Sequence, residues 1–219
     1  MNVHFLHLNM NYILHYSFNL KGSVWILQAN HMNLHGIQPE QLGVLNPLFI
    51  MILIPIFDQY VYPWCQRNGW SITHLRRISW GMGLAALSFF ISGFLESAVE
   101  AAYQEANDKS SEDDTKDSLK VNVMWQVPQI FILSVAEILV SITGLEFAYA
   151  NSPPSMKALI MATFQLTTAV GDLFGGALYS ILCVLDRNII LHICGGLMIM
   201  NLIIFRQIER RWDRTLQEQ

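Results

Sequence analysis

The acidic side chain of Glu137 lies in the middle of an apolar stretch of the sequence between Pro128 and Tyr149. An ionised carboxylate at the centre of a membrane costs roughly 2.5 to 3.5 kcal/mol on insertion scales, so it normally faces the interior of a helix bundle or a water-filled path. On a helix, Ser134 and Ser141 would share one face with Glu137. A carboxylate in such surroundings can bind an ammonium group strongly and exchange it for a proton. We therefore expect this face to contact a solute.

The composition places the chain among membrane proteins. Hydrophobic residues make up 53% of the sequence and charged residues only 14%, whereas about a quarter of the residues of a soluble domain are charged. Several apolar runs reach the length of about 20 residues that a helix needs to cross a bilayer. The predicted spans of this kind are residues 43–63, 75–95, 123–149, 159–185 and 188–205.

A further predicted span, residues 12–30, is less apolar, because it contains His15, Asn19, Lys21 and Gln28. Taken alone, it is also compatible with an amphipathic helix that lies in the membrane interface. The first ten residues lack the basic flank and cleavage site of a signal peptide. With this span included, the sequence predicts an all-α membrane protein built as a six-transmembrane-helix bundle.

Charged residues outside the spans indicate the orientation of the chain. Residues 97–121 separate three spans in residues 1–96 from three in residues 122–207, and their acidic composition predicts a disordered external loop. Lys and Arg gather on the opposite side, which the positive-inside rule makes cytoplasmic. Both termini are then cytoplasmic, and residues 208–219 form a cytoplasmic tail. The inner side collects Arg67, Arg76, Arg77, Lys157, Arg206, Arg210, Arg211 and Arg214.

Other kinds of chemistry find little support in the sequence. The seven histidines and three cysteines show no spacing typical of a metal site or a disulfide, so no metal is expected. The chain has no phosphate loop and no basic patch with interleaved aromatic residues, which argues against nucleic-acid binding. The C-terminal arginines are more simply interpreted as an anchor for lipid headgroups. Paired catalytic groups are also missing, and we do not expect an enzyme.

Several short motifs along the chain together resemble the proton-coupled oligopeptide transporters. The resemblance runs from about Phe18 to the last span, and the combination of motifs is specific. The motifs are Gly22-Ser23-x-Trp25-x-x-Gln28-Ala29, Asn46-Pro47-x-x-Ile50, Ile54-Pro55-Ile56-Phe57-Asp58, Trp125-Gln126-Val127-Pro128-Gln129, Glu137-x-x-x-Ser141, Gly144-Leu145-Glu146-Phe147 and Ser155-Met156-Lys157.

That family belongs to the major facilitator superfamily, in which two six-helix halves rock about a central site. At 219 residues the chain resembles only the C-terminal half, helices seven to twelve. The resemblance implies that Glu137 holds the amino terminus of a peptide and that Ser141 completes the pattern of that helix. It places the ring of Trp25 beside the cavity, although a packing role for Trp25 is the alternative. Gln28 and Asn30 are further candidates for substrate binding.

Two intramembrane charges depart from the family's pattern. Lys21 falls where the family usually has Gln, and Asp172 falls where it usually has Asn. A charge pair between the two would reduce the free-energy cost of burying either. We therefore interpret Lys21 and Asp172 as residues that alter gating or coupling.

The resemblance implies the C-terminal half of a proton-coupled di- or tripeptide symporter, with protons as the coupling ion and no other cofactor. Its expected partners are di- and tripeptides, the lipid bilayer, and the missing N-terminal six-helix half or a second chain, without which we expect no transport. The alternative is a non-transporting regulatory or degenerate half-transporter that associates with a full-length relative. The plasma membrane is the expected location, with an endosomal or vacuolar membrane as the alternative.

Overall fold

The computed structural model of the protein describes residues 24–34, 36–69, 73–109, 120–150, 152–182 and 184–217, and these residues are arranged almost entirely in helices. Among the described residues, five helical stretches are long and apolar enough to cross a membrane, which confirms the predicted all-α membrane class. They overlap the five strongly apolar runs of the sequence. The stretches are Pro39–Arg67, His74–Ala106, Val123–Ala150, Pro154–Leu182 and Arg187–Gln207.

The first predicted span is described only at its end. Residues 24–30 are helical, and residues 12–23 lie outside the described residues. After this helix the chain forms an isolated bridge with the start of another span, because Asn33 and Asn122 pair as a parallel β-bridge. The backbone N–H of Asn33 donates to the backbone carbonyl of Val121 over 2.8 Å. This bridge fixes the end of the 24–30 helix beside the span that carries Glu137.

Two of the spans are interrupted near their middle by a π-helical turn. In the first of them, Pro55 lies inside the helix and has no N–H to donate, which disturbs the hydrogen-bond ladder next to the turn. In the second, the hydroxyl of Ser134 donates back to the carbonyl of Ile130 over 2.9 Å, a contact that often bends helices. The elements of the two spans are η1 Pro39–Val44, α2 Leu45–Ile56, η2 Phe57–Val61 and α3 Tyr62–Arg67, then η3 Val123–Gln126, α6 Val127–Glu137, η4 Ile138–Ile142 and α7 Thr143–Ala150.

The longest helix, α4, extends from His74 to Lys109. The prediction of a disordered loop from residue 97 is therefore wrong for residues 97–109, and residues 110–119 lie outside the described residues. The segment after Glu96 is rich in Ala, Glu and Gln, which are good helix formers. The amide of Gln104 also donates to the carboxylate of Glu100 one turn earlier, over 3.2 Å. Charge alone suggested a loop, but helix propensity and this local contact continue the helix beyond the apolar run.

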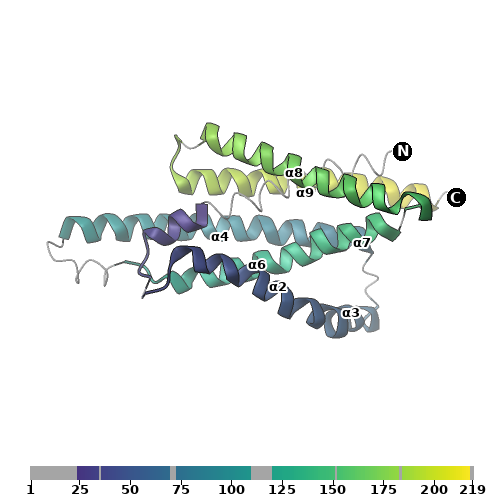
Figure 1. Cartoon of the computed structure of the whole chain (residues 1–219), viewed down its shortest axis with the longest axis horizontal. Helices are drawn as coiled ribbons and strands as arrows, with labels where there is room; N and C mark the ends of the chain where they lie inside the picture. The colour runs from purple at the N-terminus through teal and green to yellow at the C-terminus, as the bar shows by residue number, and fades with distance from the viewer. Residues whose placement is uncertain are drawn as a thin grey trace.

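α4 forms the centre of the bundle, between α6 on one side and α9 (Arg187–Gln217) on the other (Figure 1). Gly81 lets α4 approach the α6–η4 span closely, because a Cβ at this position would lie 2.5 Å from Cγ2 of Val140. Side chains of α4, α6 and α9 form one apolar core, which also includes the indole of Trp25. A second core joins the start of α9 to α4 through Leu191 and Phe89. These contacts position the helix that carries Glu137.

The remaining spans leave much apolar surface uncovered. α8 (Lys157–Leu182) exposes Leu173 and Phe174 to 74% and 67%. In the span Pro39–Arg67, only 6% of the most apolar 18-residue segment is buried inside the bundle. Exposed apolar surface of this extent marks contact with lipid or with another protein. The bundle is therefore closed around α4 and open along the span Pro39–Arg67.

Candidate functional site

Glu137 is the last residue of α6, immediately before the π-helical turn η4, and its side chain is partly buried. Its Oε2 accepts a hydrogen bond of 3.0 Å from the amide nitrogen of Asn46 in α2. The amide oxygen of Asn46 in turn accepts a bond of 2.7 Å from the hydroxyl of Ser134. Asn46 therefore joins the carboxylate and the serine on one face of α6, which is the face that the sequence predicted. A hydrogen bond to a charged acceptor is stronger than one between neutral groups, so it holds the carboxylate in place.

Trp25 lies next to this polar centre. A cavity of about 150 Å³ is lined by Trp25, Asn46, Gln126 and Ile130, among others. Asn46 therefore contacts the cavity on one side and Glu137 on the other. The two principal residues of the predicted site, Trp25 and Glu137, are far apart in the sequence, and the structure connects them through Asn46.

Two side chains near this centre carry a polar atom that is buried away from solvent. Within the described part of the chain, neither Nε1 of Trp25 nor Oγ of Ser141 has a hydrogen-bond partner. Ser141 lies inside the π-helical turn that follows Glu137. Buried polar groups are satisfied in the great majority of proteins, so each exception calls for an explanation. A donor of this kind can bind a ligand or a water molecule.

The side chain of Gln28 lies in a buried hydrogen-bond network and is not exposed to a solute. Its side chain is fully buried, and its Oε1 accepts bonds of 2.9 Å from Gln126 and 3.1 Å from Gln129. Its amide nitrogen donates to the carbonyl of Ser92 in α4 over 3.2 Å. The network joins the 24–30 helix to α4 and α6. Asn30, near the end of the same helix, is exposed.

The predicted pair of Lys21 and Asp172 cannot be placed, because Lys21 lies outside the described residues. Asp172 is partly buried in α8 and is not isolated from other groups. The role of both residues in gating or coupling remains a prediction.

An ion-pair cluster joins three elements at the end of the bundle predicted to be external. Nε of Arg187, the first residue of α9, lies 2.8 Å from Oε1 of Glu96, whose side chain is only 2% exposed. The same guanidinium lies 3.2 Å from Oε2 of Glu100 and donates to the carbonyl of Leu27 over 3.2 Å. Its Nη2 is also 2.8 Å from Nδ1 of His31. The cluster therefore connects the 24–30 helix, α4 and α9.

His31 is the residue of this cluster whose charge can change near neutral pH. Burial and then the nearby guanidinium of Arg187 lower the pKa of His31 below its ordinary value, while Glu100 opposes them. The imidazole also stacks on the ring of Tyr103, with centroids 4.2 Å apart. A neutral imidazole is thus favoured beside the arginine.

Asn46 and Arg187 are the residues of these two centres whose roles sequence reasoning missed. From the sequence, Asn46 was included only in a motif with Pro47, and Arg187 was given no role. The signal for Asn46 was a lone amide at the start of an apolar run, and the signal for Arg187 was a basic residue directly before one. Their partners Glu137 and Glu96 are 91 residues away in the sequence in each case. Only the fold brings them together.

Comparison with solved structures defines the class of protein. The chain is similar to a crystal structure of an auto-inhibited POT family peptide transporter, with a TM-score of 0.77 and 26% identity over 94% of this chain and 40% of the other. It is also similar to the in meso crystal structure of the POT family transporter PepTSo, with a TM-score of 0.74 and 28% identity over 95% of this chain and 41% of the other. The chain is thus an integral membrane protein with part of a major facilitator transporter fold.

Sequence relatives make the assignment more specific. A family profile described as PTR2, POT family, matches residues 4–190. The peptide transporter PTR2 of Saccharomyces cerevisiae is 36% identical over 156 residues, which are 71% of this chain and 25% of that protein. Solute carrier family 15 member 3 of Mus musculus is 29% identical over 92% of this chain and 38% of that protein. The chain therefore belongs to the POT family, and it spans between a quarter and two fifths of the length of these relatives.

Proposed function

We propose that this chain forms the C-terminal half of a proton-coupled symporter for di- and tripeptides. In this proposal the carboxylate of Glu137 binds the protonated amino terminus of the peptide. The observation that carries it is the position of Glu137: a partly buried carboxylate, held by Asn46, in the middle of an apolar span. A charge in such a place normally serves a substrate or ion pathway.

The neighbouring groups suit a peptide better than a simple cation. The hydroxyl of Ser141 and the indole N–H of Trp25 are buried polar groups that could contact the carbonyls or side chains of a peptide. The aromatic face of Trp25 could pack against a side chain or a cation. The cavity beside Asn46 measures about 150 Å³, which is smaller than most ligand pockets. Further walls would have to come from elsewhere.

A second six-helix unit would supply those walls. The span Pro39–Arg67 contains Asn46, and its most apolar window is only 6% buried, so the helix next to Glu137 is also the one most in need of a partner. We propose an N-terminal half, on the same chain or a second one, as that partner. Protons would couple to transport through exchange at Glu137 and through acids of the other half. We place the assembly in the plasma membrane with both termini cytoplasmic.

The test is uptake of a labelled dipeptide into proteoliposomes with an inward proton gradient. The original chain is reconstituted with and without a matching N-terminal half. The variant Glu137→Gln and its matched control Glu146→Gln are then tested under the same two conditions. Glu146 carries the same charge in α7 but is exposed. We expect uptake only with both halves, lost in Glu137→Gln and kept in Glu146→Gln.

Three results would contradict this proposal. Uptake by the chain alone would show that no second half is needed. If Glu137→Gln kept the same uptake as Glu146→Gln and the original chain, Glu137 would have no part in the mechanism. Stable assembly of the two halves without uptake would favour the alternative, a regulatory half-transporter.

A further inference from the structure

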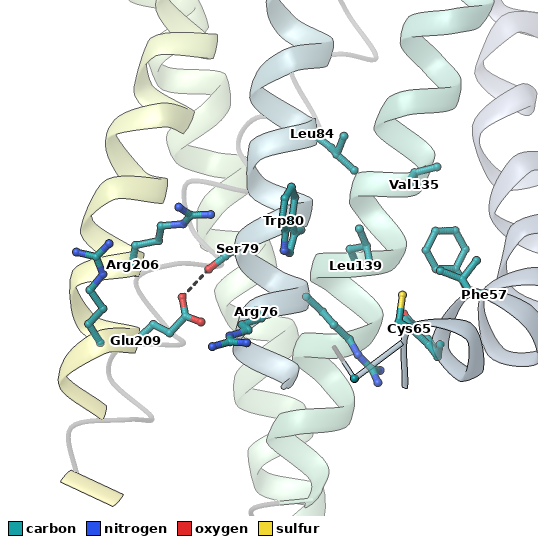
Figure 2. Close-up of a pocket in the computed structure, with 15 residues that line it drawn as sticks. Phe57, Cys65, Arg76, Ser79, Trp80, Leu84, Val135, Leu139, Arg206 and Glu209 are labelled. Atoms are coloured by element: carbon teal, nitrogen blue, oxygen red, sulfur yellow. Dashed lines mark hydrogen bonds between the residues drawn. The ribbon is translucent and has the colours of Figure 1, made fainter. Parts of the chain in front are cut away.

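A second and larger pocket lies near the end of the bundle predicted to be cytoplasmic. Its volume is about 850 Å³, which is in the range of ligand pockets, and it opens across α4 between α9 and the η2–α3 segment. Figure 2 shows Leu84 and Val135 toward one end of this pocket and Arg76 and Glu209 toward the other. The pocket is therefore amphipathic along its length.

The polar end of the pocket carries a positive charge. Among the described residues that line it, four are arginines and one is a glutamate: Arg76, Arg77, Arg206, Arg210 and Glu209. Oε2 of Glu209 accepts a bond of 2.9 Å from the hydroxyl of Ser79, which holds this acid against α4 (Figure 2). The residues that line this end therefore carry a net positive charge, which favours an anion.

Part of this charge is already fixed in position. The guanidinium of Arg77 lies over the ring of Tyr62, with Cζ 3.8 Å from the ring centroid. A cation held over an aromatic face loses less side-chain freedom when it binds an anion. Arg76 and Arg77 come from the start of α4, while Arg206 and Arg210 come from the end of α9, so the pocket combines basic residues from two spans.

An apolar stripe continues from the pocket along α4. Trp80, Leu87 and Phe94 are spaced by seven residues, which places them on one face of the helix, and they are exposed by 62%, 47% and 67%. Trp80 also lines the pocket. Tryptophan is enriched at the level of lipid headgroups, and the deeper part of the stripe suits acyl chains. A ligand that fits both regions has an anionic head and an apolar tail.

We propose that this pocket binds the headgroup of an anionic phospholipid, with the phosphate near Arg206 and Arg210 and the acyl chains along the stripe of Trp80, Leu87 and Phe94. Basic pockets between helices on the cytoplasmic side suit such headgroups. Val135 and Leu139, on either side of Glu137 in the sequence, line the same pocket, but the proposal does not depend on peptide transport.

The test is native mass spectrometry of the full chain, purified in detergent and titrated with phosphatidylserine or with phosphatidylcholine. We expect a saturable complex with phosphatidylserine and weaker binding of phosphatidylcholine. The double variant Arg206→Gln/Arg210→Gln should bind phosphatidylserine roughly thirty-fold more weakly, because each arginine near a headgroup contributes about a factor of five. The control, Arg67→Gln/Lys157→Gln, removes the same charge from residues that do not line the pocket. Equal weakening in the two double variants would overturn the proposal.

Two further measurements separate a lipid from a free anion and guard against misfolding. Trp80→Gln should weaken phosphatidylserine binding without changing the unfolding temperature, since Trp80 is largely exposed. Inorganic phosphate at millimolar concentration should not displace the lipid. If phosphate displaces it, or if Trp80→Gln binds as the original chain does, the pocket takes a soluble anion and the lipid proposal is wrong.

Discussion

Arg187 and Glu96 form an ion pair in which Nε and Oε1 are 2.8 Å apart, and the Glu96 side chain is only 2% exposed. The pair joins the first residue of α9 to the interior face of α4. Because the carboxylate is buried, the arginine is its main compensation for the water that it has lost. The ends of two spans and of the 24–30 helix therefore depend on this one guanidinium.

Replacing Arg187 with Gln should lower the free energy of unfolding by about 3 to 5 kcal/mol, because the substitution leaves a charge buried without its partner. The double variant Glu96→Gln/Arg187→Gln should recover much of this loss. Thermal unfolding in detergent measures both, with Arg67→Gln as an exposed arginine for comparison. A single variant as stable as the comparison would show that the pair contributes little.

His31 should make stability depend on pH. Its folded pKa is lowered below the ordinary 6.5, first by burial and then by Arg187, so the unfolded chain binds the proton more readily than the folded one. The contribution of His31 is therefore present above about pH 6.5 and is lost as the pH falls through the lowered folded pKa. The unfolding temperature should drop across this interval in the original chain and less in His31→Gln. His74→Gln, at the other end of α4, should keep the full drop, and a slope unchanged in His31→Gln would contradict the assignment.

Gly81 should be intolerant of a side chain. The Cβ of Gly81→Ala would lie 2.5 Å from Val140 Cγ2 and 2.9 Å from Leu139 Cβ, so α4 would have to move away from the opposite span. We expect a loss of about 1 to 3 kcal/mol, the usual range for overpacking. Gly83→Ala is the matched control, because its Cβ would meet only Leu202 Cδ2 at 3.8 Å. The same unfolding assay compares the two, and equal stability would show that α4 and η4 are not in close contact.

Ser141 and Ser134 should behave differently although both lie near Glu137. Ser134→Ala removes a hydroxyl that can donate to Oδ1 of Asn46 or to the carbonyl of Ile130, and it should cost about 1 kcal/mol of stability. Ser141→Ala removes a hydroxyl without a partner among the described residues, so stability should stay within about 0.5 kcal/mol. If Ser141 contacts the peptide, uptake by the paired halves should still fall several-fold. Unchanged uptake in Ser141→Ala would assign that hydroxyl no part in binding.

The sequence was sufficient for the features that depend on local composition. Apolar runs predicted the five spans, because length and hydropathy alone decide whether a helix can cross a bilayer. The charge of Glu137 within an apolar run also identified the polar centre, because a charge in a membrane normally faces the interior of the bundle or a water-filled path. The first part of the acidic segment was predicted wrongly, since charge density suggested a loop where Ala, Gln and Glu continue α4 to Lys109.

The partners of these residues could not be predicted in the same way. Asn46 and Glu137 meet because α2 lies against α6, and Arg187 and Glu96 meet because α9 lies along α4. Neither relationship is visible in spacing along one helix. For Gln28, a motif suggested that the side chain binds substrate, whereas the fold buries it against Gln126 and Gln129.

The π-helical turns of η2 and η4 make these two spans tolerant of a change in length. A π-helical turn contains one residue more than an α-helical turn of the same hydrogen-bonded ladder. Deleting one residue from Phe57–Val61 or from Ile138–Ile142 would therefore leave a continuous α-helix, with the flanking elements still in register. Gene variants that lack a single codon at either turn should still encode a foldable bundle, whereas the same deletion within α4 would rotate half of its core side chains out of place.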